Sequence, residues 1–319
     1  MRPHTMRSTA ALLLVASLLL PTSAFAVPPS YITQWGTAGT GSGQFNAPFD
    51  VKVGSGGLVY VADAANNRIQ VFTGSGAYQF EWAVGNPYEL AINASGNVYE
   101  ADYSSSSVQE FTSTGSLVTQ WGGFGTGNGQ FQYVSGVALD ASGDVYVMDW
   151  IGCRVQKFTG SGTYLTQWGS NGSGNGQFVD PYGIAVGPSG TVYVVDRGNS
   201  RVQAFTGTGT YVTQWGTNGA GNGQFNQPFG ITVDPSGRVY VVDAGNSRVE
   251  VFTASGSYLD QWGTVGGGNG QFLYPYGIGL DASGDIYVTD SGNSRVEEFG
   301  QLPTSTHSST WGGIKAKYR

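Results

Sequence analysis

One short unit recurs six times along the chain, and this repeat constrains the fold more than any other feature. The segment Tyr-Leu-Thr-Gln-Trp-Gly at 164–169 returns with small changes, and its tryptophan recurs at intervals of 47, 39, 47, 47 and 47 residues. A fixed period of this length is typical of a propeller blade or of one turn of a solenoid. The six tryptophans are Trp35, Trp82, Trp121, Trp168, Trp215 and Trp262.

Each unit contains four short β-rich runs that are separated by Gly, Asn and Ser turns. In the unit from Pro181 these runs are 182–186, 192–196, 201–205 and 211–215. The pattern predicts an all-β fold, a six-bladed β-propeller of four-stranded antiparallel blades. The segment 31–35 has the sequence of a fourth strand, but it lies before the first strand of the first unit. We therefore expect this N-terminal strand to join the last blade and close the ring. The alternative, a β-solenoid, does not need such a pairing of the ends.

The composition agrees with a turn-rich β protein. Glycine contributes 52 of the 319 residues, whereas charged residues make up only 11 %. This excludes a coiled coil, a disordered chain and a typical charged helical enzyme. The net charge of −7 does not favour nucleic acid as a partner, because nucleic-acid binders need a basic surface.

The two ends of the chain depart from the repeat. Arg2 and Arg7 precede an apolar run at 10–20, and Ala24-Phe25-Ala26 has the small-x-small pattern of a signal-peptide cleavage site. We therefore expect a signal peptide at 1–26, a propeller at 27–300 and a polar, weakly basic tail at 301–319. The protein would then be secreted or extracytoplasmic, with no membrane span after cleavage.

The repeated unit resembles a known sequence family. The residues that carry the resemblance are Gly221-Asn222-Gly223-Gln224-Phe225, Pro228, Gly230-Ile231, 239–243, 245–249 and Phe252, which are similar to the NHL repeat. The resemblance spans about 31–300, with five strong copies and one degenerate copy, and implies a six-bladed propeller of the secreted bacterial type. It does not select a function, because that family includes lyases, sensors, scaffolds and RNA binders.

Histidine is missing from the repeats. It occurs only at His4 and His307, whereas the family's peptide-amidating lyases hold zinc through histidines in the propeller channel. The sequence therefore excludes a zinc site of that type, and it also excludes a Ser-His-Asp hydrolase within the propeller.

The degenerate second unit carries the features that break the repeat. The linker after Trp82 is eight residues shorter than the others, which predicts a notch in one face of the ring at blade 2. Asp50 and Glu89 stand where the other first strands have glycine, and Lys52 lies two residues after Asp50. Because first strands line the channel of a propeller, we expect these three side chains to cluster at its mouth, either as an ion pair or as a site for a cation.

Three further substitutions lie near the notch. Glu100 replaces a second-strand valine, so its carboxylate should be buried and should need a partner or a raised pKa. Tyr103 and Trp150 each follow the aspartate that ends a second strand. Exposed aromatic side chains of this kind anchor glycans or protein side chains; alternatively, Trp150 fills the gap left by the missing linker residues.

Two functions stay open on this basis. The first is a secreted, non-enzymatic binding or scaffold module without a cofactor, which recognises a protein or glycan near blades 2 and 3. The alternative is a calcium-dependent lactonase- or lyase-like enzyme with the metal at Asp50 and Glu89. The candidate ligand-binding residues are Tyr103, Trp150, Asp50, Lys52, Glu89 and Glu100. The sequence does not determine the oligomeric state.

Overall fold

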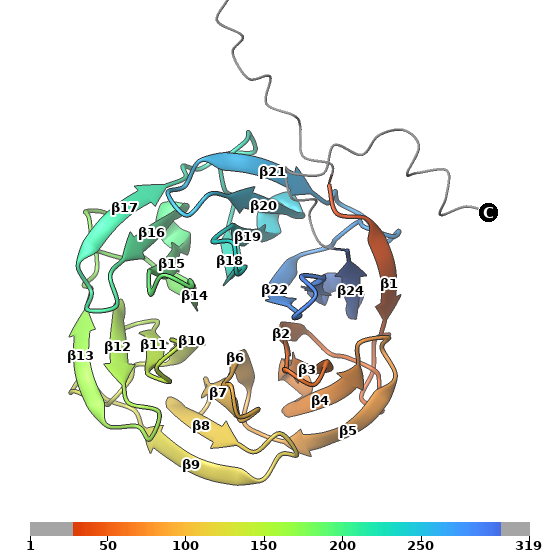
Figure 1. Ribbon diagram of the computed structural model, residues 1–319, viewed down its shortest axis with the longest axis horizontal. Coiled ribbons are helices and arrows are strands. Elements are labelled where there is room, and N and C mark those ends of the chain that lie inside the picture. Colours follow the sequence, from red (N-terminus) through yellow and green to blue (C-terminus); the bar gives the residue numbers. More distant parts are fainter. Residues whose placement is uncertain (1–27, 301–319) are drawn as a thin grey trace, which may run out of the picture.

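Six four-stranded antiparallel sheets are arranged as blades around a common axis in the computed structural model, which describes residues 28–300 (Figure 1). The innermost strands are β2 (Pro48–Val53), β6 (Pro87–Ile92), β10 (Val134–Leu139), β14 (Pro181–Val186), β18 (Pro228–Val233) and β22 (Pro275–Leu280). The second strands are β3 (Leu58–Asp63), β7 (Val98–Asp102), β11 (Val145–Asp149), β15 (Val192–Asp196), β19 (Val239–Asp243) and β23 (Ile286–Asp290).

The third and outer strands complete each blade. The third strands are β4 (Arg68–Thr73), β8 (Ser107–Phe111), β12 (Arg154–Phe158), β16 (Arg201–Phe205), β20 (Arg248–Phe252) and β24 (Arg295–Phe299). The outer strands are β5 (Tyr78–Ala83), β9 (Leu117–Gly122), β13 (Tyr164–Trp168), β17 (Tyr211–Trp215), β21 (Tyr258–Trp262) and β1 (Tyr31–Trp35). Blades are numbered in chain order from β2, so blade 6 holds β22, β23, β24 and β1.

The ring is closed by strands from opposite ends of the described chain. β1 pairs antiparallel with β24, which places Trp35 opposite Val296. The sheet order β1-β24-β23-β22 confirms the prediction that the N-terminal strand at 31–35 completes the last blade. The predicted signal peptide at 1–26 and the tail at 301–319 lie outside the described residues. No helix in the part of the chain that the structure describes is long and apolar enough to cross a membrane.

Apolar side chains fill the interfaces between blades. Phe45, from the linker before blade 1, is fully buried and packs with Tyr287 and Val296 of blade 6. Four other linkers place a fully buried phenylalanine in the same way, and they contribute Phe131, Phe178, Phe225 and Phe272. Blade 2 has no such residue, because its linker has only three residues, 84–86, against eleven residues, 123–133, before blade 3.

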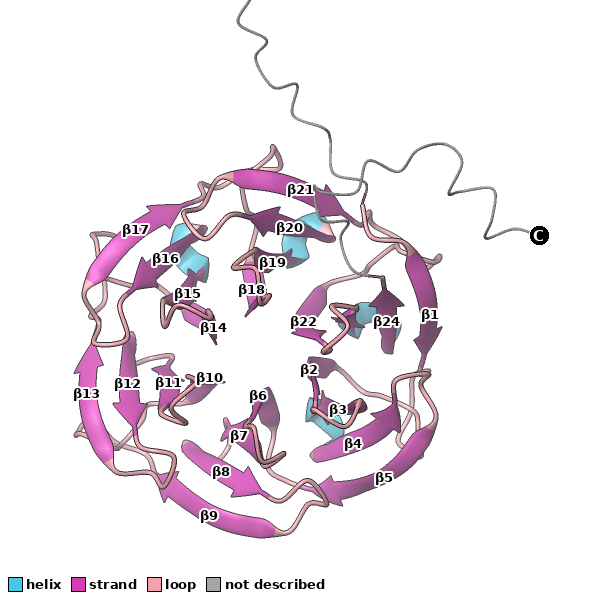
Figure 2. Ribbon diagram, viewed as in Figure 1, coloured by secondary structure: helices cyan, strands magenta, loops and turns pink. Residues whose placement is uncertain are grey.

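A buried ion pair organises the loop between the second and third strands. In blade 4, Asp196 Oδ2 accepts a hydrogen bond from Arg201 Nε at 2.6 Å, while Asp196 Oδ1 accepts from the Val179 backbone N–H at 2.8 Å. The loop folds into a one-turn 3-10 helix, η2 (Arg197–Asn199), and Figure 2 shows such helices as short cyan turns between strands. Because Val179 belongs to the linker, linker and loop lie on one face of the ring, here called the loop face.

The same Asp–Arg ion pair occurs in four other blades, which supports a structural role for these repeated residues. The pairs are Asp63–Arg68, Asp149–Arg154, Asp243–Arg248 and Asp290–Arg295. The other one-turn helices are η1 (Ala64–Asn66), η3 (Ala244–Asn246) and η4 (Ser291–Asn293). In blade 2 a serine, Ser107, stands at the arginine position, so Asp102 accepts instead from Ser105 N–H at 3.0 Å and Gln109 Nε2 at 2.8 Å.

Candidate functional site at the channel mouth and the loop face

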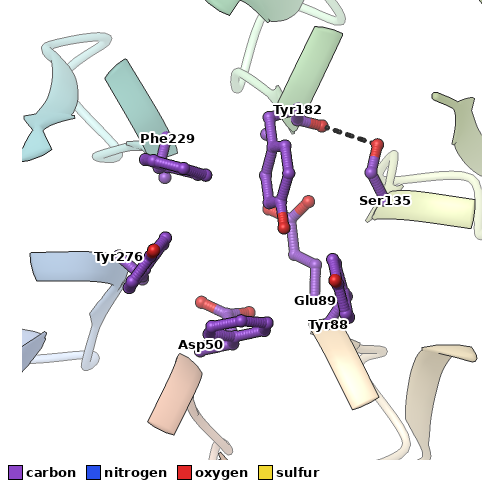
Figure 3. Close-up of a pocket in the computed structure, with 11 residues that line it drawn as sticks. Asp50, Tyr88, Glu89, Ser135, Tyr182, Phe229 and Tyr276 are labelled. Carbon is purple, nitrogen blue, oxygen red and sulfur yellow. Dashed lines mark hydrogen bonds between the residues drawn. The ribbon is translucent and has the colours of Figure 1, made fainter. Parts of the chain in front are cut away.

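The mouth of the central channel is surrounded by aromatic side chains. Each innermost strand contributes its second residue, and five of these six residues are aromatic (Figure 3). Adjacent ring centroids are 4.3 to 5.8 Å apart around the whole circuit. We call these five residues the aromatic collar; they are Phe49, Tyr88, Tyr182, Phe229 and Tyr276. The collar surrounds a small cavity of about 20 Å³, which has room for about one water molecule and opens to solvent.

Blade 3 interrupts the collar with Ser135. Its hydroxyl donates a hydrogen bond to the backbone carbonyl of Tyr182 at 3.4 Å, or to that of Pro181 at 3.3 Å. The rings of Tyr88 and Tyr182 therefore approach each other across the serine, with centroids 5.8 Å apart. This is the widest gap between neighbouring rings of the collar.

Asp50 and Glu89 lie beside the collar, on neighbouring sides of the opening (Figure 3). Lys52 Nζ donates to both carboxylate oxygens of Asp50, at 2.8 and 2.7 Å, and also to the Ile278 carbonyl at 3.1 Å. Asp50 Oδ2 accepts a further hydrogen bond from the Leu90 backbone N–H at 2.8 Å. Burial raises the pKa of Asp50, and the neighbouring Lys52 ammonium opposes that rise. The structure thus brings Asp50, Lys52 and Glu89 together. Only Asp50 and Glu89 line the mouth, however, and Lys52 lies on the side of the channel away from the collar.

Glu89 is less well satisfied than Asp50. Its side chain is buried, and its Oε2 atom has no hydrogen-bond partner among the described residues. Burial raises the pKa of Glu89 well above its usual range; the nearby Lys52 lowers it, and the Asp50 carboxylate raises it further. At the channel mouth, Glu89 is therefore the carboxyl group whose ionised form is less well stabilised.

Glycines on the neighbouring strands explain why these two carboxylates fit. A Cβ atom on Gly136 would lie 2.6 Å from Glu89 Oε2, and one on Gly277 would lie 2.5 Å from Asp50 Oδ1. Both distances are shorter than van der Waals contact allows, so a side chain at either glycine would displace a carboxylate. The adjacent glycines therefore create the space that holds Asp50 and Glu89.

A stack of tyrosines extends outward from the collar onto the loop face. The rings of Tyr88 and Tyr103 are 4.5 Å apart with planes 9° apart, and those of Tyr103 and Tyr133 are 4.8 Å and 21° apart. Phe124 contacts the end of the stack edge-on at 5.9 Å, and its side chain is 67 % exposed. We call Tyr88, Tyr103 and Tyr133 the tyrosine stack; it crosses from blade 2 to the linker before blade 3.

Trp150 is held next to this stack by a polar chain. Its ring lies 6.0 Å from that of Tyr103, and its Nε1 donates a hydrogen bond to Asp180. The other oxygen of Asp180 pairs with Arg197, whose guanidinium lies 4.5 Å from the Phe229 ring centroid. Aromatic and charged groups thus follow one another over blades 2 to 5.

This arrangement answers the alternative interpretation of Trp150. The missing linker residues would cover the interface between blades 1 and 2, as Phe45 covers the interface between blades 6 and 1. Trp150 is instead bound to Asp180 of the linker before blade 4. This contact with Asp180 does not favour the interpretation that Trp150 fills the gap, although the Tyr103 ring beside Trp150 belongs to blade 2.

Glu100 lies apart from the channel group. Val98, two residues earlier on the same face of β7, packs with Tyr60 and Val71 in the interface of blades 1 and 2. Glu100 is 0 % exposed, and neither of its carboxylate oxygens has a hydrogen-bond partner in the described part of the chain. Burial, with a contribution from Asp102, raises the pKa of Glu100 well above its usual range. This carboxyl group occupies the one blade interface that lacks a linker phenylalanine.

The side chains at the channel mouth provide few ligands for a metal ion. Within residues 28–300, no group of three or more His, Cys, Asp or Glu residues gathers in a geometry that could hold a metal ion. Calcium takes six to eight oxygen ligands, so an ion at Asp50 and Glu89 would draw most of its ligands from carbonyl groups and water. It would also compete with the Lys52 ammonium for Asp50.

The sequence and the structure can both be compared with known proteins. The NHL repeat model matches residues 45–72, 178–205, 225–252 and 272–299. With six blades of one repeated design, the chain belongs to the NHL repeat family. None of the curated proteins matches the sequence.

Solved structures share the fold at low sequence identity. A streptogramin B lyase has a TM-score of 0.61 at 14 % identity, and the match covers 86 % of this chain and 98 % of that one. A gluconolactonase from Xanthomonas campestris has a TM-score of 0.62 at 14 % identity, with 87 % and 98 % covered. An auxiliary nutrient binding protein from Bacteroides ovatus has a TM-score of 0.64 at 13 % identity, with 86 % and 78 % covered. At such identity the likeness concerns the fold alone.

Proposed function

We propose that this propeller is a non-catalytic binding module whose ligand, a protein or a glycan, lies on the loop face over blades 2 to 4. The observation that carries the proposal is the tyrosine stack beside Trp150 and the Asp180–Arg197 pair. Tyr, Trp and Arg are the residues that most often carry the binding energy of an interface. The stacked rings are already ordered, so a ligand that contacts them does not have to immobilise them.

The chemistry of the loop face fits both ligand classes. A protein ligand would contact the exposed apolar side chains of Phe124 and Ile151, which are 67 % and 50 % exposed. A glycan would contact ring edges and exchange hydrogen bonds with Asp180 and Arg197, which already lie beside Trp150. Among the structural neighbours, those described as nutrient binding proteins agree with a binding role.

A glycan array and a cross-linking capture from the producing cells' medium would test the proposal, each with the wild-type chain and with Trp150→Ala. We expect wild-type binding in one of the two assays and at least a tenfold loss in the variant, since a hot-spot residue contributes about 2 kcal/mol or more. Leu117→Ala, at an exposed position of the outer strand β9, is the matched control and should bind normally. Equal binding by the wild type and Trp150→Ala would contradict the proposal.

Export is part of this proposal, because the N-terminal segment has the features of a signal peptide. Mass spectrometry of the protein from the medium or the periplasm should give a mature N-terminus at Val27. A cytosolic protein that retains Met1 would contradict export.

A calcium-dependent lactonase- or lyase-like enzyme is the second candidate. It is favoured by the two carboxylates, Asp50 and Glu89, that meet at the channel mouth, and by a lactonase and lyases among the structural neighbours. Calorimetric titration with calcium chloride tests it. A heat of binding that Asp50→Asn removes would support the enzyme, and an absence of heat with the wild type would end this candidate.

A further inference from the structure

We infer that the channel mouth binds a primary alkylammonium group, with Glu89 accepting its hydrogen bond and the aromatic collar surrounding its charge. This site goes beyond the loop-face contacts of the proposed function. It shares Tyr88 with the tyrosine stack, but Glu89 and the other four collar residues are not part of that stack. It also requires a small organic cation rather than a metal ion.

The first argument is the unsatisfied carboxylate. Glu89 is only 6 % exposed, and its Oε2 atom lacks a hydrogen-bond partner among the described residues although the residue lines the opening. A buried polar atom without a partner costs about 1–3 kcal/mol, so such atoms call for an explanation. A donor that enters from solvent through the collar would satisfy it.

The second argument is the distribution of charge. Lys52 forms an ion pair with Asp50, since its ammonium group donates to both carboxylate oxygens at 2.8 and 2.7 Å. Lys52 also lines a cavity with Gly54 and Asp281 near the first-to-second strand loops, on the opposite side from the collar. The positive charge of Lys52 is therefore paired with Asp50, and a cationic ligand beside Glu89 would stabilise the ionised form of that carboxyl group.

The third argument is the collar itself. Five aromatic rings with centroid separations of 4.3 to 5.8 Å form a closed circuit. A cation on the axis of so small a ring lies within the ~6 Å over which an aromatic face attracts a positive charge. The collar hydroxyls belong to Tyr88, Tyr182 and Tyr276, and they supply further acceptors for an ammonium group.

The choice of a primary ammonium over other cations follows from these contacts. A primary ammonium donates three hydrogen bonds and carries an apolar stem. Its head group is close to a water molecule in size, so it fits the small cavity beside Glu89 while the stem extends toward solvent. A quaternary ammonium has the charge but no donor. Calcium would need six to eight oxygen ligands, and the faces of aromatic rings do not provide them.

Calorimetric titration with propylammonium chloride in an amine-free buffer at constant ionic strength tests the inference. We expect saturable binding with a Kd on the order of 1 mM, a range that so small a ligand can reach. Titrations with 1-propanol, tetramethylammonium chloride and calcium chloride should give clearly weaker binding or none. Propanol that binds as tightly as propylammonium would overturn the inference, as would the absence of any propylammonium heat.

Variants locate the binding within the channel. Glu89→Gln should weaken propylammonium binding at least about tenfold, because the amide oxygen can still accept a hydrogen bond but no longer carries the negative charge that strengthens it. Glu81→Gln, which removes a carboxylate from the outer strand β5, is the matched control and should bind as the wild type does. If Glu89→Gln does not fold, Tyr276→Leu gives a second measurement, and it should weaken binding several-fold by removing a ring.

The results also separate this inference from the proposed function. Trp150→Ala should leave propylammonium binding unchanged, since Trp150 is not part of the collar. Unchanged propylammonium binding in both Glu89→Gln and Tyr276→Leu would overturn the site. Neither result would alter the test of the loop face by glycan array and cross-linking.

Discussion

Tyr88 and Tyr103 stack face to face, with ring centroids 4.5 Å apart and planes only 9° apart. Tyr88 belongs to the collar around the channel, whereas Tyr103 follows the second strand on the loop face. This single contact joins the two parts of the candidate site into one aromatic surface. A ligand on the loop face would therefore lie directly beside the channel mouth.

The first prediction concerns this contact. Tyr103→Ala removes stacking against Tyr88 and Tyr133, and each aromatic pair contributes about 0.5–1.5 kcal/mol beyond its buried area. We expect the melting temperature to fall by several degrees, since 1 kcal/mol corresponds to about 2–4 °C in a domain of 150–250 residues. Thermal denaturation followed by near-ultraviolet circular dichroism would measure it. Tyr103→Phe keeps the ring and should melt as the wild type does, so a similar loss in both variants would show that stacking is not the cause.

The second prediction concerns the buried carboxyl group between blades 1 and 2. Glu100→Val restores the valine found at the equivalent position of the other blades and removes two buried oxygens that have no hydrogen-bond partner within residues 28–300. We expect the free energy of unfolding at pH 8 to rise by about 1–3 kcal/mol, measured by urea denaturation. The gain should shrink at low pH, where the carboxyl group is protonated in both the folded and the unfolded state. A loss of stability at pH 8 would mean that Glu100 has a partner outside the described residues.

The third prediction follows from a glutamate that replaces glutamine in blade 5. In blade 4, Gln203 Nε2 donates to the Gln177 carbonyl at 2.7 Å and to Asp196 at 3.1 Å. Glu250 cannot donate there when ionised, and its Oε2 atom has no hydrogen-bond partner among the described residues. Burial raises the pKa of Glu250 from 4.5 to about 7. The folded state therefore binds more protons than the unfolded state between these values, and stability falls as the pH rises through this range.

Glu250→Gln should accordingly raise the melting temperature at pH 8, by several degrees, and have little effect near pH 4. The reverse variant, Gln203→Glu, is the matched control and should lower the melting temperature at pH 8. Differential scanning calorimetry at both pH values would measure the difference. A gain from Glu250→Gln that is the same at pH 4 and pH 8 would contradict the shifted pKa.

The fourth prediction concerns the closure of the ring. Deleting residues up to Trp35 removes β1 and leaves the backbone groups of β24 unpaired at a sheet edge. Exposed edges pair with other chains, so we expect the truncated protein to form dimers or larger species in size-exclusion chromatography. A shorter deletion that ends at Ser30 keeps β1 and should elute as the wild type does. A truncated chain with wild-type elution and stability would show that β1 is not needed for closure.

Much of the architecture could be read from the sequence because each blade repeats the same local pattern. The intervals between tryptophans gave the number of blades, and the orphan strand that ends at Trp35 gave the closure with β24. The clustering of Asp50, Lys52 and Glu89 could also be predicted, since first strands line the channel of a propeller. These inferences needed only the strand order and the periodicity.

Other parts of the site depend on contacts between segments that are distant in sequence. An aromatic residue recurs in five of the six first strands, which was a visible signal, but the sequence does not show that these rings meet around one opening. The contact of Trp150 with Asp180 also crosses from one blade to the next. Such contacts follow from the angle and spacing of neighbouring blades.

The repeat by itself determined a six-bladed ring of four-stranded sheets, because alternating apolar residues and glycine turns at a fixed period allow few other ways to bury the same surface. Only the tertiary structure decided that Lys52 pairs with Asp50 and that Glu89 Oε2, beside the aromatic collar, has no hydrogen-bond partner among the described residues. It also decided that Glu100 faces a blade interface. These outcomes depend on which side chains meet across blades, and small differences in distance and burial decide which carboxylate finds a partner.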